Sequence, residues 1–131
     1  MELGKGRFGV VFLVKEKESQ NCYAAKYLKT RTRSYKDQAL AEIDLLKSLN
    51  HDHIINYIDS YVDFKAVVIV MEYLEGGELF VKISDEDYVL TESDCSIFMS
   101  QICTGVQYLH QNLVVHLDLK VRDFQKDKNN I

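Results

Sequence analysis

The chain has 131 residues, of which 47% are hydrophobic and 27% charged, a composition typical of a globular domain with a core of its own. Its formal net charge of -4 argues against a nucleic-acid-binding surface and against a polybasic membrane anchor, since both need clustered Lys and Arg. No run approaches the roughly 20 apolar residues of a membrane span, and the three cysteines lack the C-x-x-C spacing of a zinc site. We therefore expect a cytoplasmic protein that binds neither nucleic acid nor membrane.

Three glycines near the start of the chain, Gly4, Gly6 and Gly9, have G-x-G-x-x-G spacing. Glycine lets the backbone come close to a ligand, so that N–H groups can surround phosphate oxygens. In a dinucleotide-binding fold the last glycine leads into a helix. Here it leads into the β-branched run 10–14, which predicts a strand, so we expect the glycines to join two strands of a hairpin. A glycine-rich hairpin without a ligand is the alternative.

The apolar run 22–28 predicts a further strand with a lysine, Lys26, in its interior. A lysine in a strand more often points to solvent at a sheet edge. Ala24 and Ala25 beside it are small enough to leave space for a bulky planar ligand. The sequence leaves open whether Lys26 faces solvent or a binding site.

A helical period follows over residues 35–50, with Ser34 as the expected N-cap and Asp37 three residues later. Glu42 comes directly before Ile43 of the apolar stripe, so its carboxylate could reach inward to a lysine of the adjoining sheet. A solvated helix glutamate is the alternative.

Two more strands are expected at 54–61 and 66–71, and the second is a continuous apolar run that we place in the centre of the sheet. Gly76 and Gly77 then break the chain before a short helix, and they mark the best candidate boundary between a sheet unit and a helical unit. Thr91, with Asp94 three residues later, predicts the start of a long helix that runs to His110.

A charged triplet near the C-terminus, His116, Asp118 and Lys120, follows the short apolar run 113–115, which we expect to be strand-like. A carboxylate and an ammonium two residues apart suit a catalytic loop that acts on a phosphate and an attacking hydroxyl. On its own, such a stretch is more often a solvated turn. The residues upstream therefore decide what the triplet means.

The order of these features is similar to that of a eukaryotic-type protein kinase domain over residues 2–120: a glycine-rich hairpin, a strand lysine, a helix glutamate, a long helix and a His-x-Asp-x-Lys loop. Stretches 75–80, 90–92 and 116–120 most resemble the calcium/calmodulin-regulated group, which includes the myosin light-chain kinases and the titin- or twitchin-like kinases. The resemblance implies an α+β fold, in which a lobe with a twisted antiparallel sheet and one helix precedes the first helices and the catalytic loop of an incomplete helical lobe. It divides the chain into 1–74, the N-terminal lobe with its hinge, 75–120, the start of the C-terminal lobe, and 121–131, a divergent polar tail.

The resemblance also implies an ATP site, with magnesium as a further cofactor. The residues that would surround ATP are Gly4, Gly6, Gly9, Val11, Ala24, Lys26, Glu42, Met71, Glu72, Leu74 and Glu78. The glycines would cover the phosphates, and Val11 and Ala24 would pack on the adenine. Lys26, held by Glu42, would bind the α- and β-phosphates.

The remaining roles concern the connector and the catalytic loop. Met71 would be the gatekeeper, Glu72 and Leu74 would offer backbone hydrogen bonds to adenine, and Glu78 would meet the ribose hydroxyls. Asp118 would orient the substrate Ser or Thr hydroxyl and accept its proton, and Lys120 would neutralise charge on the transferred group. The implied partners are a protein substrate, for which myosin light chain is a candidate, and calmodulin for a full-length parent only.

The sequence leaves the kinase pattern directly after Lys120. Val121, Arg122 and Asp123 stand where the family has Pro, Glu and a metal-binding Asn, which makes Asp123 the candidate magnesium ligand. No Asp-Phe-Gly or Ala-Pro-Glu motif follows, as in a truncated or misassembled gene product, so we expect phosphoryl transfer by this chain to be very weak or absent. The alternatives are a non-catalytic ATP-binding or interaction fragment and an unstable product without function.

Overall fold

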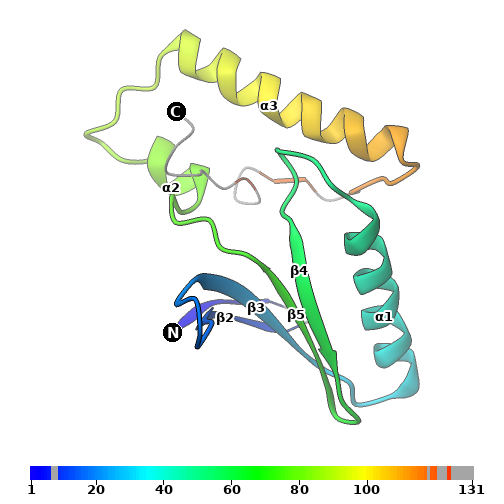
Figure 1. The fold of residues 1–131 in the computed structure, drawn as a ribbon. Helices are drawn as coiled ribbons and strands as arrows, with labels where there is room; N and C mark the ends of the chain where they lie inside the picture. Colours follow the sequence, from blue (N-terminus) through cyan, green and yellow to red (C-terminus); the bar gives the residue numbers. More distant parts are fainter. Residues whose placement is uncertain (7–8, 118, 121–123, 125–131) are drawn as a thin grey trace. The chain divides into compact units, whose positions relative to one another are not determined.

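The computed structural model describes residues 1–6, 9–117, 119, 120 and 124. The chain forms two compact units, the first made of residues 1–50 and 54–73 and the second of residues 51–53 and 74–131. The first unit is an antiparallel sheet with one helix, and the second contains two helices among its described residues (Figure 1). This architecture confirms the α+β fold that the sequence predicts.

Five strands make up the sheet, in the order β1-β2-β3-β5-β4. Along the chain they span β1 (Glu2–Lys5), β2 (Val10–Lys15), β3 (Cys22–Lys29), β4 (Tyr57–Val62) and β5 (Ala66–Glu72). β1 and β2 form the predicted glycine-rich hairpin. β5 lies inside the sheet between β3 and β4, in keeping with its continuous apolar run.

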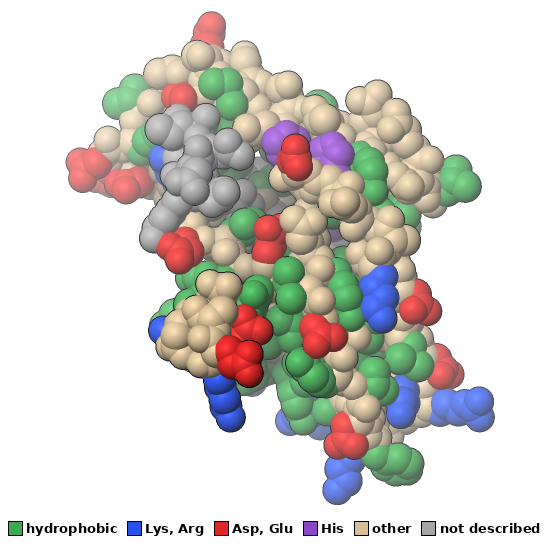
Figure 2. All heavy atoms as spheres, in the orientation of Figure 1, with side chains coloured by type: hydrophobic (Ala, Val, Ile, Leu, Met, Phe, Trp, Pro, Cys, Tyr) green, Lys and Arg blue, Asp and Glu red, His purple; other side chains and the backbone are tan. Residues whose placement is uncertain are grey.

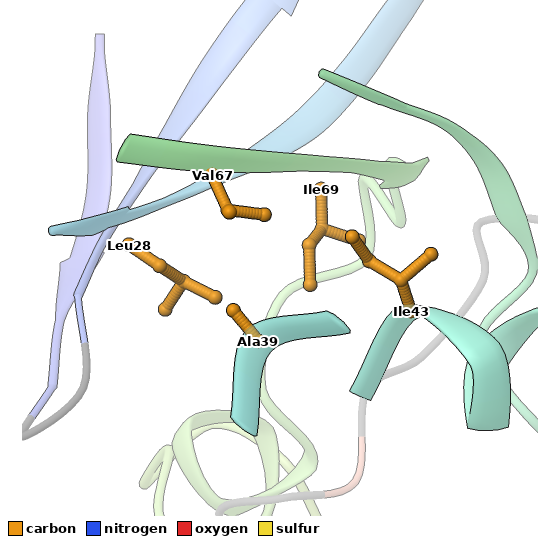
Figure 3. Close-up of a cluster of buried hydrophobic side chains, with 5 residues drawn as sticks. All are labelled: Leu28, Ala39, Ile43, Val67 and Ile69. Atoms are coloured by element: carbon orange, nitrogen blue, oxygen red, sulfur yellow. The ribbon is translucent and has the colours of Figure 1, made fainter. Parts of the chain in front are cut away.

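Helix α1 (Arg33–Ser48) packs against β4 and β5 and closes the core of the first unit. Ala39 and Ile43 of the helix are buried among Leu28, Val67 and Ile69 of the sheet (Figure 3). Val67 and Ile69 are completely inaccessible to solvent. Full burial of side chains of this size stabilises the fold by about 1.5–3 kcal/mol each.

The N-cap of α1 is Thr32, so the prediction of Ser34 is wrong. Thr32 has the extended backbone that an N-cap needs (φ -132°, ψ 163°), and its side chain accepts a hydrogen bond from the Tyr35 N–H at 3.4 Å. Ser34 lies within the first turn of the helix. The helix ends at Ser48, two residues before the predicted end.

β4 begins at Tyr57, three residues later than predicted. The N–H of Asn56 donates to Oε1 of Glu72 at 2.7 Å, and the Asn56 carbonyl accepts from the Glu72 N–H at 3.0 Å. Because its N–H is bonded to a side chain, Asn56 takes no place in a strand ladder. The apolar residues before it, Ile54 and Ile55, are partly buried without forming a strand.

The second unit contains α2 (Leu79–Ile83) and α3 (Glu92–Gln111). α3 starts at the predicted capping box, in which the Asp94 N–H donates to Oγ1 of Thr91 at 3.1 Å and the Thr91 N–H donates to Oδ2 of Asp94 at 3.0 Å. The imidazole of His51 stacks on the ring of Tyr108, with 4.8 Å between the centroids. α3 also carries two exposed thiols, those of Cys95 and Cys103. None of the described helices combines the length and the apolar character that a membrane crossing requires.

Residues 113–115 do not form the expected strand-like segment. The Leu113 N–H donates to the His110 carbonyl at 3.0 Å, and the Val114 N–H donates to the Leu109 carbonyl at 2.9 Å. Together with the positive φ of Leu113, 61°, these two bonds make a Schellman motif that closes α3. The backbone donors are bonded to the helix end and are not available to a strand partner.

Candidate functional site

One face of the sheet brings together four of the residues that the sequence singles out. The register of β2 and β3 places Val11 opposite Lys26, and the register of β3 and β5 places Ala24 opposite Met71. Directly opposite residues of antiparallel strands share a face, and so do residues two apart on one strand. Ile69, opposite Lys26, is on the same face and is covered by α1. The four residues therefore line the continuation of the face on which the helix packs.

Lys26 and Glu42 form an ion pair on this face. The Lys26 Nζ donates to Oε1 of Glu42 at 2.5 Å. Glu42 directly precedes the buried Ile43 on α1, and this position turns its carboxylate toward β3. The two side chains are 25% and 36% exposed, so the pair adds only about 0.2–1 kcal/mol to stability. Its main effect is to hold an ammonium group at a fixed position on the face of Val11 and Ala24.

The three glycines of the hairpin differ in their surroundings. A Cβ atom added at Gly9 would lie 2.3 Å from the Tyr27 carbonyl oxygen, whereas one added at Gly4 or Gly6 would meet nothing within 4 Å. The Gly6 N–H donates to the Gly9 carbonyl at 2.9 Å, which closes the turn. Position 9 therefore requires a residue without a side chain, because β2 comes close to β3 there. Gly4 and Gly6 have open space beside the hairpin.

The end of β5 carries Met71 and Glu72, and the two hydrogen bonds between Glu72 and Asn56 fix the backbone there. The sequence did not predict this contact. Its only signal is a polar Asn56 that interrupts the apolar run 54–58. The next two candidate residues, Leu74 and Glu78, belong to the second unit, where Glu78 is the N-cap of α2.

The candidates for catalysis and metal binding belong to the second unit as well. Lys120 is exposed, whereas Asp118 and Asp123 lie outside the described residues. Within the described part of the chain no three His, Cys, Asp or Glu residues form a group that could hold a metal ion. A hollow along α3 is lined by apolar, amide, thiol and imidazole groups and offers no Lys or Arg for a phosphate: Ile102, Cys103, Val106, Gln107, His110 and Gln111.

The first unit thus provides an ammonium group held by a carboxylate, on an apolar face with one small residue, next to a glycine-rich hairpin. An ammonium group binds phosphate oxygens through charge-assisted hydrogen bonds. An apolar face with a small side chain accepts a planar ring. The described residues therefore fit the phosphates and the base of a nucleotide.

Comparisons with known proteins point to one family. The family model described as protein kinase domain matches residues 1–130. Myosin light chain kinase 3 of Danio rerio is 47% identical over 118 residues, 90% of this chain and 16% of that protein. Myosin light chain kinase family member 4 of Homo sapiens is 44% identical over the same share of the chain and 30% of its own length. The twitchin kinase region of C. elegans matches 98% of this chain and 23% of that chain, with a TM-score of 0.88 and 37% identity. The chain spans less than a third of the length of each.

Proposed function

Because the chain belongs to the protein kinase domain family, we propose that its first unit binds ATP and that the chain is the nucleotide-binding part of a serine/threonine protein kinase. The observation that carries this proposal is the Lys26–Glu42 ion pair on the face shared by Val11 and Ala24. The similarity to myosin light chain kinases and to a twitchin kinase supports the same assignment.

In this proposal each residue of the first unit has a separate task. Lys26 binds the α- and β-phosphates, and Glu42 keeps its ammonium group in place. Val11 and Ala24 pack on the same side of the adenine ring, because their side chains share one face of the sheet, and the N–H groups around Gly4, Gly6 and Gly9 surround the phosphates. Bound ATP supplies the phosphoryl group that is transferred.

The connector supplies the remaining contacts to the nucleotide. Met71 limits the depth of the adenine site, and the backbones of Glu72 and Leu74 hydrogen-bond to the base. Glu78 accepts hydrogen bonds from the ribose hydroxyls. The bonds between Asn56 and Glu72 support this arrangement, because they hold the end of β5 in one conformation.

We assign catalysis to the second unit. Asp118 orients a protein Ser or Thr hydroxyl and takes its proton, and Lys120 balances the charge of the transferred group. Asp123 is the proposed ligand of a magnesium ion. The corresponding segments are an N-terminal lobe with its hinge at 1–74, the start of the C-terminal lobe at 75–120 and a tail at 121–131. Myosin light chain is the substrate to test first, and calmodulin is a proposed regulator of a full-length parent only.

Transfer by this chain is expected to be very weak. Asp123 stands where the family has Asn, which adds a negative charge and removes an amide donor beside the proposed metal. Transfer of a phosphoryl group depends almost entirely on the positions of the metal ion and the reacting oxygens. Binding of ATP, in contrast, depends mainly on the residues of the first unit. A non-catalytic ATP-binding fragment is therefore the second candidate function.

Nucleotide binding is tested by titration of the purified chain with a fluorescent ATP analogue. Lys26→Met should abolish the signal, and Glu42→Gln should weaken binding about fivefold, because the ammonium loses the partner that positions it. Lys29→Met and Asp44→Asn remove the same charges from exposed positions on the same two elements and serve as controls. No binding by the unchanged chain, or equal losses in the control variants, would refute the proposal.

Transfer is tested separately with radiolabelled ATP and a myosin light-chain peptide. We expect incorporation of label to be close to background, and Asp118→Asn to remove what remains. Strong labelling of the peptide by the unchanged chain would show that the tail is compatible with catalysis. Binding without any labelling would identify the second candidate, a non-catalytic ATP-binding fragment.

A further inference from the structure

Two connections of the first unit meet at one end of the sheet. One leads from β3 into α1, and the other is the turn between β4 and β5. The Thr30 N–H donates to the Lys65 carbonyl at 3.1 Å, and the Lys36 Nζ donates to the Asp63 carbonyl at 3.5 Å. These bonds bring residues 29–36 and 62–65 together into one surface.

This surface is strongly basic although the whole chain is acidic. It carries four cations: Arg31, Arg33, Lys36 and Lys65. The side chain of Lys29, one residue after the buried Leu28 of β3, belongs to the other face of the sheet. Residues 29–36 include no acid, and the nearest acids along the chain are Asp37 and Asp63. None of the four cations forms an ion pair with a carboxylate of the described residues. The chain has a formal net charge of -4, but this surface has an excess of positive charge.

The same surface also exposes apolar side chains. Phe64, at the turn between β4 and β5, is 86% exposed, and Val62 at the end of β4 and Tyr35 in the first turn of α1 are exposed by about half. Figure 1 draws the turn between β4 and β5 and the chain entering α1 at the bottom of the view. In the same region Figure 2 shows Lys and Arg side chains next to hydrophobic ones. We call the four cations with Tyr35, Val62 and Phe64 the basic-aromatic patch.

We propose that the basic-aromatic patch binds an acidic peptide segment of a partner protein, one that carries an apolar side chain among its carboxylates. The carboxylates pair with Arg31, Arg33 and the lysines, and Arg favours such pairing because its guanidinium binds a carboxylate with two parallel hydrogen bonds. The apolar side chain of the peptide packs on Phe64, which removes an exposed ring from water. The patch includes neither Lys26 nor Glu42, so we expect the peptide to bind without ATP.

A peptide fits this surface better than an anionic membrane does. Outside the patch the chain is more acidic than its total charge of -4, since the patch itself is basic. A charged lipid surface is broad and would also face these acidic parts, which it repels within about 10 Å at ordinary salt. A short peptide contacts the patch alone. Its negative charge and its single apolar side chain match the two features that occur together here.

The test is fluorescence anisotropy with a labelled peptide, Asp-Glu-Asp-Phe-Glu-Asp, added to the full chain without ATP. We expect binding that weakens as the ionic strength rises. The same peptide with Ser in place of Phe should bind about tenfold less tightly, because the apolar contact is lost. The peptide with Asn and Gln in place of its acids should not bind.

Matched variants locate the site. Arg31→Ala with Arg33→Ala should weaken binding about tenfold, whereas Lys15→Ala with Lys17→Ala, which removes the same charge from the end of β2 and the turn after it, should leave it unchanged. Phe64→Ser should weaken binding, and Val81→Ser, at an exposed apolar position on α2, should not. All six substituted residues are exposed, so each variant is expected to keep the unfolding midpoint of the parent chain.

Three results would overturn the proposal. The first is an equal loss of binding in the Lys15 and Lys17 variant, which would indicate attraction by total charge alone. The second is equal affinity for the Phe and Ser peptides, which would show that Phe64 has no part. The third is sedimentation of the chain with phosphatidylserine vesicles without binding to the peptide, which would assign the patch to a membrane. None of these results bears on ATP binding, so the two proposals fail or stand separately.

Discussion

Thr30 is a local weak point where β3 leads into α1. Its Oγ1 is buried and has no hydrogen-bond partner among the described residues. A buried hydroxyl without a partner costs about 1–3 kcal/mol. Thr30→Val keeps the shape and removes the hydroxyl, so we expect the free energy of unfolding in urea to rise by about 1 kcal/mol. Thr104→Val is the control, because the Thr104 hydroxyl donates to the Ser100 carbonyl at 2.7 Å; a gain of the same size there would contradict this explanation.

Substitutions at two glycines of the hairpin should have different effects on stability and on ligand binding. Gly9→Ala would place a Cβ against the Tyr27 carbonyl, and strands β2 and β3 would have to move apart. We expect it to lower the free energy of unfolding by about 1–3 kcal/mol. Gly6→Ala should leave stability unchanged within about 0.5 kcal/mol, and on the proposed function it should weaken ATP binding. Thermal unfolding and nucleotide titration of both variants measure the two effects, and equal stability of the two variants would contradict the prediction.

At the scale of elements, the end of α3 has an unfavourable residue in a well-formed motif. Leu113 adopts φ 61° at the position that glycine usually takes in a Schellman motif, and its side chain is 93% exposed. The left-handed conformation costs a residue with a Cβ about 1–2 kcal/mol. Leu113→Gly should therefore stabilise the chain by about 1 kcal/mol. Val81→Gly, inside the exposed part of α2, should instead destabilise it, and thermal unfolding compares the two.

The start of α3 is sensitive to acid. Hydrogen bonds from the Thr91 hydroxyl and the Thr91 backbone lower the pKa of Asp94 from its usual value of 3.8. The unfolded chain therefore takes up this proton first as the pH falls. The contribution to stability is complete above pH 3.8 and is lost as the pH falls through the lower pKa of the folded state. NMR titration of the Asp94 carboxyl should give a value below that of an Asp94-containing peptide, and Asp94→Asn should remove the dependence.

The elements could be predicted where local pattern and long-range contacts agree. Thr91 and Asp94 form the predicted capping box because both partners are three residues apart on one helix end. The start of α1 could not be decided, since Thr32 and Ser34 are both good N-caps and only the backbone conformation distinguishes them. The late start of β4 could not be predicted either, because it follows from the bond of Asn56 to Glu72, which is 16 residues away. A contact at that distance leaves no periodic signal.

The candidate site shows the same limit. The resemblance to protein kinases implied the pairing of Glu42 with Lys26, whereas the residues alone left open whether each side chain faces solvent. The structure brings the two side chains together. The role of Gly9 in strand packing could not be seen, since it depends on the distance between β2 and the Tyr27 carbonyl oxygen.

At the scale of the whole molecule, the buried apolar side chains are concentrated in the first unit. Its core cluster lies between α1, β3 and β5, whereas Leu79 and Leu109 are the buried large apolar residues of the described part of the second unit. Ile69→Ala should lower the free energy of unfolding by about 2–5 kcal/mol and Leu109→Ala by about 2 kcal/mol. Native-state hydrogen exchange should be slowest in β3 and β5. Slower exchange in α3 than in β5 would contradict this distribution of stability.

Helix α3 determines which disulfides its two thiols, Cys95 and Cys103, can form. Cys95 and Cys103 are both exposed and are eight residues apart, which corresponds to about 12 Å along a helix. A disulfide needs Cα atoms within about 7 Å of each other. As long as α3 is intact the two thiols cannot join each other, so any disulfide that they form must be with a thiol elsewhere, on a small molecule, another part of the chain or another copy of it. The folded helix thereby keeps its own cysteines apart and leaves both available to external redox partners.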